Sequence, residues 1–556
     1  MTAVEDQRTE VLRPVDRAPR APRALLWLLV PIPVLLATAE AIRSPKMNFN
    51  DYWAILAKVT GDDGVLRPLA LFKLYNEHPI ALVGPVFWLD AKLFDAANQA
   101  LGLFSVALVL VLFATLVSML PARLTGNARV AVIACLSALL FSSSALEFFG
   151  MGMSGVHWLV GIVPAVLALR FAHRGNTAVA VVFGVIGCFG HGAAFPIWVS
   201  LAMMAWLRRD ELWRFVLPIG FGVLTLALWL LPSRQPGYPS STLVGVDTML
   251  GTALAMLGQV WAARSTDVAF ATGTLTAAVF AFVVFQALPK KGARPAQSTV
   301  DDSGWFALAF HVVLVAIMVG FSRSRLGTAE ALGPRYAMVA LLGACALLVL
   351  LVLRGPRLAR HHVVPLALTV AVMTYAVGSA QATAVRENYP RQPMLAVAMR
   401  VDARAVIDSM NWSTKVLPVL RSMKAYPFSD DFTLGCGRYE LGSLVDMSRV
   451  KELPGPSGVS RTAGAVETGP VVGNSKIAGW AVLDGEAADC VLVVDGSSEV
   501  VGGGAVDVPR ADVASTTRGT GRGGWNAVAR PGVEDGVVLV GSEDQLYRIS
   551  LVIKAG

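Results

Sequence analysis

The sequence predicts an all-α polytopic membrane bundle of about eleven transmembrane helices, followed by an extracytoplasmic α+β region that ends in a small β-sandwich. The 556 residues are 55% hydrophobic and only 15% charged, against roughly 25% charged in soluble domains. The mean hydropathy is +0.58. The apolar residues form long runs, and basic residues concentrate in the short segments between these runs. A single soluble globule is therefore excluded.

Segments without Asp, Glu, Lys or Arg in their interior define the predicted transmembrane helices. They lie near 24–42, 102–120, 129–147, 156–172, 177–190, 194–207, 215–232, 268–288, 304–321, 337–353 and 363–382. Together these segments make the membrane domain, residues 24–382, which follows a basic tail at 1–23.

Arginine and lysine fill the tail and every second loop, which predicts that these segments face the cytoplasm of a multi-pass protein in the plasma membrane. The N-terminus is then cytoplasmic, and everything after residue 382 is extracytoplasmic. The same distribution explains the net charge of +8 by orientation in lipid, so we expect membrane lipids and no nucleic acid as partners.

One apolar run, residues 177–207, has basic residues at both ends and therefore requires a hairpin. Gly190-His191-Gly192 lies in its middle, so each arm would reach only about 21 Å, less than the roughly 30 Å of a bilayer core. Short, glycine-interrupted spans indicate a cavity that opens to one side of the membrane. The alternative is that His191 is simply interfacial.

The two long outer loops, 43–101 and 233–267, carry further helical patterns. Amphipathic segments at Tyr52–Val59 and Val83–Leu93 are expected along the interface, and Val246–Ala263 is expected to be a surface helix.

After residue 382 the composition changes abruptly. Residues 383–464 are predicted to be helical and then irregular, and 465–556 shows short apolar runs between Gly and Asp turns, which predicts the β-sandwich. Cys436 and Cys490 lie in this outer region, where an oxidising exterior permits a disulfide between them, although spacing alone does not establish the pairing.

Side chains able to do chemistry gather near the predicted outer ends of the spans, which excludes reactions that need cytosolic nucleotide donors and leaves lipid-linked donors. They are Asp51, Glu77, His78, Glu147, His157, His191 and Arg335. Each has a simpler interpretation. Asp51 fits a solvated loop residue, the Glu77-His78-Pro79 segment fits a turn, and Glu147 and His157 fit a pair bonded only to each other.

Arg335 precedes Tyr336 at the outer start of a span. An arginine there either extends to lipid headgroups or captures a phosphate with its planar guanidinium at the mouth of a cavity. We expect Asp51 and Arg335 to face one common cavity, lined by Glu77 or His191. His311, in mid-span among apolar neighbours, is expected only to pack the bundle.

The order of these features resembles that of the GT-C glycosyltransferases that use polyprenyl-phosphate sugars. The features are a basic tail, a first span, a long outer loop with an early acid, about eleven spans, a late outer Arg335-Tyr336 and a C-terminal outer module. The phrases Asn76-Glu77-His78-Pro79-Ile80 and Trp88-Leu89-Asp90 are also similar to bacterial envelope proteins of this type, and the Ala/Val/Arg/Gly-rich composition is similar to actinobacterial arabinosyl- and mannosyltransferases. The first-loop acid of that superfamily is often doubled, whereas Tyr52 follows Asp51 here.

The resemblance implies inverting transfer of a sugar from a polyprenyl-phosphate donor to an envelope glycan or lipid acceptor. Asp51 would be the general base, and Arg335 with Tyr336 would bind the donor phosphate. The acceptor would be oriented, or the catalytic groups supported, by five further side chains: Glu77, His78, His191, Glu147 and His157. The resemblance implies no certain cofactor. Some members need a divalent metal, for which Asp51, Glu77 and His78 would be the candidate ligands.

The outer module resembles small sandwiches appended to envelope sugar enzymes, which implies that Trp480 or Trp525 stacks on a sugar ring. The simpler interpretation is a Trp that anchors the core of the module. Two other functions remain open for the whole chain: a carrier or flippase of lipid-linked sugars, and a non-catalytic envelope protein that binds polysaccharide.

Overall fold

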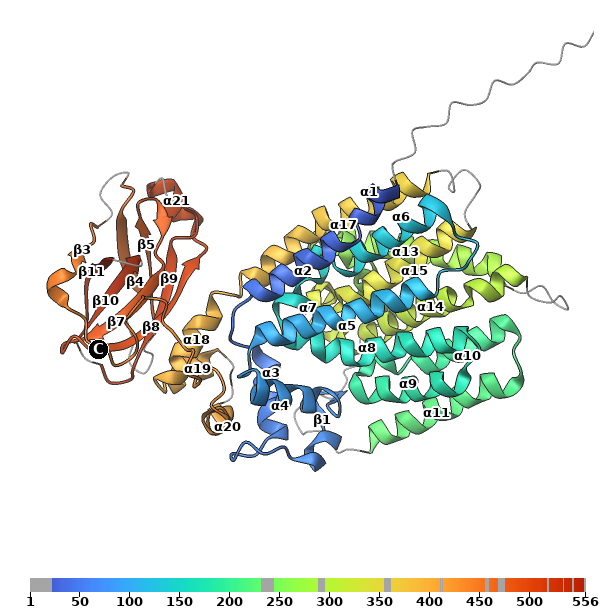
Figure 1. Cartoon of the computed structure of the whole chain (residues 1–556), viewed down its shortest axis with the longest axis horizontal. Helices are drawn as coiled ribbons and strands as arrows, with labels where there is room; N and C mark the ends of the chain where they lie inside the picture. The colour runs from blue at the N-terminus through green and yellow to red at the C-terminus, as the bar shows by residue number, and fades with distance from the viewer. Residues whose placement is uncertain are drawn as a thin grey trace, which may run out of the picture.

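The computed structural model describes residues 23–231, 245–288, 296–354, 362–410, 412, 414–455, 460–468, 476–517, 520–533, 535–542 and 545–554. Nearly all of the basic tail and residues 232–244 of the second outer loop therefore lie outside the described residues. Figure 1 shows long helices running side by side, a β-rich region to one side of them, and α18 and α19 between the two.

Nine helical segments of the described chain are long and apolar enough to cross a membrane, which is compatible with a multi-pass membrane protein. They comprise α1 and α2 (Arg23–Leu28, Pro31–Arg43), α5 (Asn98–Ser118), α6 with η2 and α7 (Gly126–Leu140, Ser143–Ala145, Leu146–Gly150), α8 (Gly152–His173), α11 (Leu212–Leu230), α13 (Thr266–Ala287), α14 with η5 (Gln297–Arg323, Ser324–Leu326), η7 with α15 (Pro334–Tyr336, Ala337–Arg354), and α17 with α18 (Val363–Arg386, Arg391–Arg400). Each coincides with a predicted span. Large apolar side chains remain exposed on their outer faces, as Phe285 is at 75%, which suits contact with lipid.

The remaining two predicted spans form the short hairpin. Helix α9 (Thr177–Gly190) ends at His191, and η3 (Gly192–Ala194) and α10 (Ile197–Arg208) follow it; α9 packs mainly on α8, and α10 packs mainly on α11 and α14. At 1.5 Å per residue, the 14 residues of α9 reach only about 21 Å. His191 is 1% exposed, so its side chain is buried inside the protein.

The second outer loop differs from the expectation of a surface helix. Helix α12 (Val246–Gly258) forms where predicted, but its second half is buried and it packs against α13 and α14. Helix α12 is buried because its face toward α13 is small and apolar. At Gly258 and Gly273 the two backbones lie so close together that a Cβ atom would not fit. This helix belongs to the bundle.

The segment predicted as the first outer loop folds into a layer beside the long helices, called the extramembrane layer after its predicted position. It is made of α3 (Asn50–Val59), η1 (Pro68–Phe72), β1 (Leu74–Tyr75), β2 (His78–Pro79) and α4 (Val83–Leu93). Its buried residues share one core with α18, α19 (Arg404–Ser409), η8 (Thr414–Val416) and α20 (Leu417–Met423). The rings of Trp53 and Trp412, for example, lie 5.7 Å apart. Segments from both ends of the membrane domain thus build a single extramembrane layer, which packs on α8 through Val156 and Val160.

A buried acid in this layer gives a pH prediction. The Asp90 side chain accepts a hydrogen bond from the Tyr52 hydroxyl at 2.8 Å, and burial raises the pKa of Asp90 to about 8. The folded protein therefore holds this proton more tightly than the unfolded chain, so stability falls as pH rises from about 4 to about 8, by about 1.4 kcal/mol for each pKa unit titrated.

The Asp90→Asn variant keeps an acceptor for Tyr52 and removes this titration. We expect its melting temperature, measured by intrinsic fluorescence between pH 5 and pH 8, to fall less with pH than that of the wild type and to be higher at pH 8. Asp62→Asn, a change at an exposed carboxylate of the same loop, is the control. Parallel pH profiles for Asp90→Asn and the wild type would contradict the assignment.

The C-terminal region is β-rich. Its elements are η9 (Met447–Arg449), β3 (Lys451–Glu452), β4 (Ala463–Thr468), β5 (Lys476–Leu483), β6 (Glu486–Ala487), β7 (Cys490–Asp495), β8 (Val500–Val508), α21 (Ala511–Thr517), β9 (Gly524–Ala529), β10 (Asp535–Ser542) and β11 (Gln545–Lys554). The strands form one hydrogen-bonded sheet in the order β3-β11-β10-β7-β8-β9-β5-β4, with β6 beside β5. All pairs are antiparallel except β11 with β3.

The β-rich character predicted for this region is confirmed, but its strands form one curled sheet and not the two separate sheets of a sandwich. Strand β4 lies against β11 and an apolar core fills the inside of the curl. The other face of β7, β8 and β10 is covered by α18 and the irregular segment around Leu434 and Val445.

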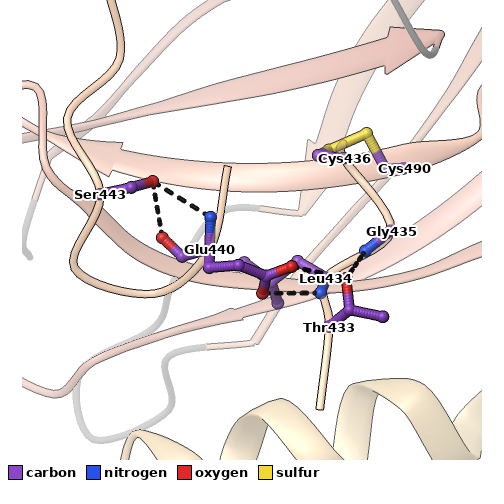
Figure 2. Close-up of a disulfide and its surroundings, with 7 residues drawn as sticks. All are labelled: Thr433, Leu434, Gly435, Cys436, Glu440, Ser443 and Cys490. Atoms are coloured by element: carbon purple, nitrogen blue, oxygen red, sulfur yellow. Dashed lines mark hydrogen bonds between the residues drawn. A yellow bond between two sulfur atoms is a disulfide. The ribbon is translucent and has the colours of Figure 1, made fainter. Parts of the chain in front are cut away.

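A disulfide fastens that covering segment to the sheet. Cys436 and Cys490, the first residue of β7, are bonded with their Cα atoms 5.4 Å apart (Figure 2). Beside them the Glu440 carboxylate accepts hydrogen bonds from the Thr433 hydroxyl and the Leu434 amide. The pairing that the sequence permitted is therefore present.

Candidate functional site

Asp51 lies in the first turn of α3. The Tyr75 hydroxyl donates a hydrogen bond to Asp51 Oδ1 at 2.9 Å. Tyr75 belongs to β1, whose pairing with β2 places Tyr75 opposite His78. The carboxylate is therefore partly buried and held in a fixed direction, and it is not a freely solvated loop residue.

The Glu77-His78-Pro79 segment belongs to a tight β-hairpin, in agreement with the turn that the sequence indicates. Asn76, at its tip, has a φ of 51°, a conformation that asparagine tolerates well. Glu77 forms an ion pair with Arg323 at the end of α14, and its Oε1 atom lies 3.7 Å from His78 Nε2. The hairpin is thereby attached to the bundle.

Three histidines from three different segments meet beneath this hairpin. His78 stacks on His191 with ring centroids 4.2 Å apart, and His157 of α8 meets both rings edge-on at 5.6 Å and 5.1 Å. Trp158 covers His191 at 4.1 Å. His78 Nδ1, His157 Nε2 and His191 Nε2 are buried, and these atoms have no hydrogen-bond partner among the described residues.

Glycines make this close approach possible. A Cβ atom on Gly161 of α8 would lie 2.6 Å from His191 Cβ, and one on Gly190 would lie 2.4 Å from the Val160 carbonyl oxygen. Gly161 is nine residues into α8, about 14 Å from its start. The tip of the short hairpin is therefore recessed below the end of α8, as the sequence predicts.

Arg335 and Tyr336 form η7 at the start of α15. Arg335 pairs with Glu330 and lies over the Tyr336 ring at 5.4 Å, with 46% of its side chain still exposed. Tyr336 is buried and meets Trp158 edge-on at 5.5 Å. Trp158 thus connects Arg335 and Tyr336 to the histidine cluster.

Glu147 belongs to α7, which packs against η7, the turn that carries Arg335 and Tyr336. It accepts a hydrogen bond from Ser154 at 2.6 Å and is not bonded to His157. The structure therefore brings all seven predicted outer residues to one region at one end of the bundle.

The electrostatics of the cluster favour neutral imidazoles next to fixed positive charge. Burial lowers the pKa of His78 well below its ordinary value, and the charges of His157, Arg323 and Arg335 act in the same direction. Such a site offers hydrogen-bond donors and two guanidiniums to an anionic ligand at pH 7.

A metal site is not evident in the part of the chain that the structure describes. Within it, no group of three or more His, Cys, Asp or Glu side chains is arranged to hold an ion. Asp51, Glu77 and His78, the candidate ligands implied by the family resemblance, do not form such a group.

The structure corrects the carbohydrate-stacking role of the two tryptophans. Trp525 is 1% exposed inside the curled sheet, and Trp480 is 7% exposed and packs against Val482 and Val513. Because β5 and β9 turn these rings into apolar clusters, neither offers an open face to a sugar. His311 is buried in the bundle, as expected.

Several residues of the site were not predicted: Tyr75, Trp158, Arg323 and Tyr389. Tyr389 donates to Glu40 at 2.8 Å and occupies the space left by Gly150, where a Cβ atom would lie 1.7 Å from its hydroxyl oxygen. Arg323 carried a signal, because it lies in the same basic outer loop as Arg335. Trp158 is adjacent to His157, but nothing in the sequence marks the direction of its ring.

The chain matches no family model, no curated protein and no solved structure.

Proposed function

We propose that this chain is a membrane glycosyltransferase that moves a sugar from a polyprenyl-phosphate donor to a glycan or lipid acceptor of the cell envelope. The observation that carries the proposal is the series of contacts that links Asp51 to Arg335. It runs through Tyr75, the stacked rings of His78 and His191, Trp158 and Tyr336. A carboxylate that can accept a proton and a guanidinium that can bind a phosphate thus lie on either side of one buried aromatic cluster, at one end of the bundle.

The chemistry assigned to these groups is an inverting displacement. The acceptor hydroxyl gives its proton to Asp51 while its oxygen forms a bond to the anomeric carbon. The bond from that carbon to the phosphate oxygen breaks, and polyprenyl phosphate leaves with the electron pair. Arg335 stabilises the charge that develops on the phosphate, and Arg323, held by Glu77, adds a second positive charge nearby.

The sidedness of this proposal is supported by the charge distribution of the loops and by the disulfide. Structural disulfides persist mainly in oxidising compartments. Cys436 bonded to Cys490 therefore favours an extracytoplasmic C-terminal region in the plasma membrane. The acceptor would then be approached from outside the cell.

Cysteine labelling of intact cells tests this orientation. A membrane-impermeant maleimide should label Ser497→Cys, in an exposed turn of the β-rich region, without permeabilisation. It should label Glu211→Cys, between α10 and α11, only after permeabilisation. The reverse pattern would exclude an outward-facing site.

The activity itself is tested with the purified full chain in nanodiscs. We expect radiolabelled sugar to pass from one of a panel of polyprenyl-monophosphate sugars to an envelope glycan, with release of free polyprenyl phosphate. Translocation of a fluorescent lipid-linked sugar across liposomes without any transfer would instead favour a carrier. Glycan binding with neither activity would favour a non-catalytic envelope protein. Either result would overturn the proposal.

A further inference from the structure

The tautomer of His191 is set by the backbone. The amide of Ala193 donates a hydrogen bond to His191 Nδ1 at 3.0 Å. An amide N–H only donates, so Nδ1 is the acceptor and a neutral His191 carries its proton on Nε2. This contact belongs to the Gly190-His191-Gly192 turn and does not depend on any ligand.

The proton on His191 Nε2 has no hydrogen-bond acceptor among the described residues. His191 is 1% exposed, and Nε2 is buried without a hydrogen-bond partner among the described residues. An unsatisfied buried donor costs about 1–3 kcal/mol, so such an atom in a well-packed site calls for an explanation. A bound metal does not explain it, because a metal ligand needs the lone pair that the Nε2 proton occupies.

The surroundings of His191 Nε2 favour an anionic acceptor. The charge of Arg323 acts on His191, and the charges of Arg323 and Arg335 act on the adjacent His78. The rings of Trp158 and His78 both pack against the His191 imidazole and restrict its rotation. A donor fixed in direction beside positive charge suits an anionic oxygen, and a hydrogen bond of this type is stronger than a neutral one.

We propose that His191 Nε2–H donates a hydrogen bond to a non-bridging phosphate oxygen of the polyprenyl-phosphate donor. His191 thus binds and positions the donor lipid at the recessed tip of the short hairpin, and it does not act as a base. The inference rests on the proposed function, which supplies the identity of the donor lipid. It adds to that function a side chain that binds the phosphate of the lipid.

Two substitutions at the same position separate this role from a structural one. In His191→Asn the amide group lies near the place of Nδ1, so it can keep the contact to Ala193 but loses the distant donor. In His191→Gln the amide nitrogen reaches toward the place of Nε2. A purely structural histidine predicts that asparagine is the better replacement, whereas a phosphate donor predicts glutamine.

Binding is measured with polyprenyl phosphate, without a sugar, added to the full chain in nanodiscs and followed by the fluorescence of Trp158 and its neighbours. We expect His191→Asn to weaken binding by about 10- to 100-fold and His191→Gln to restore most of the loss. Polyprenol, which lacks the phosphate, should bind equally to all three. His362→Asn, an exposed histidine at the start of α17, is the control.

Equal affinity of His191→Asn and the wild type for polyprenyl phosphate would overturn the inference. A deficit that appears only with sugar-bearing donors would also overturn it, because the hydrogen bond would then serve the sugar. If neither variant folds, nitrogen-15 NMR of histidine-labelled wild type decides: the inference requires a protonated Nε2 that shifts on titration with polyprenyl phosphate.

The two proposals fail separately. His191-dependent binding of polyprenyl phosphate without any sugar transfer would support the inference and reject the glycosyltransferase. Sugar transfer with binding that is independent of His191 would do the opposite.

Discussion

Replacement of Asp51 by asparagine is expected to lower the rate of sugar transfer by about 10²- to 10⁴-fold, the usual contribution of a general base. Asparagine has nearly the same shape and can still accept the Tyr75 hydrogen bond, so the local structure should survive. It cannot take up the proton of the acceptor hydroxyl. Transfer is measured under single-turnover conditions, and polyprenyl-phosphate binding is measured in parallel.

Asp62→Asn, at an exposed carboxylate of the same loop, should transfer sugar at the wild-type rate. Tyr75→Phe removes the hydroxyl that orients Asp51 and should reduce transfer less than Asp51→Asn does. Transfer by Asp51→Asn at the wild-type rate would remove Asp51 from the role of base, whatever the phenotype of the tyrosine variant.

Replacement of Asp302 by alanine is expected to destabilise the protein by about 3–5 kcal/mol, the range found when one partner of a buried ion pair is removed. Asp302 is fully buried, and its two carboxylate oxygens accept hydrogen bonds from Arg123 and, at 2.9 Å, from Arg354. The Arg354 side chain is only 13% exposed. In the variant its positive charge would therefore stay buried after the loss of its carboxylate partner.

The neighbouring acid supplies the control. Asp301 is 38% exposed and bonds to Arg123 at 3.1 Å, so Asp301→Ala should cost less than about 1 kcal/mol. Both variants are compared by denaturant unfolding in the same detergent. Equal midpoints for the Asp301 and Asp302 variants would show that the buried network does not hold α14, α15 and the α5–α6 connection together.

The helices were predictable where a single physical signal determined them. Charge-free runs identified every long apolar helix, and basic residues at both ends of 177–207 required the hairpin that α9 and α10 form. The amphipathic segment Val83–Leu93 became α4 with the same limits. Position in the sequence did not reveal that α12 is buried, because that depends on glycine contacts with a helix that follows it.

The members of the site were predictable from their type and their place at span ends, but their contacts were not. The Glu77–Arg323 ion pair joins residues 246 positions apart, and the stacking of His78 on His191 depends on a two-residue hairpin meeting a recessed turn. The tryptophans of the β-rich region were ambiguous for a related reason. The sequence pattern does not tell which face of a strand a curled sheet will cover, as it covers Trp525.

The shared core of the extramembrane layer has a consequence for biosynthesis. Trp53 emerges from the ribosome early, whereas Trp412, which packs against it, is translated only after the last membrane helix. During that interval α3 and α4 can pack on α8 but lack the part of their core that α18, α19, η8 and α20 supply. A nascent chain stalled before α18 would present this uncovered apolar surface to holdases and proteases. Shortened versions of this protein that stop after α17 should therefore be recovered poorly even though every transmembrane helix is complete.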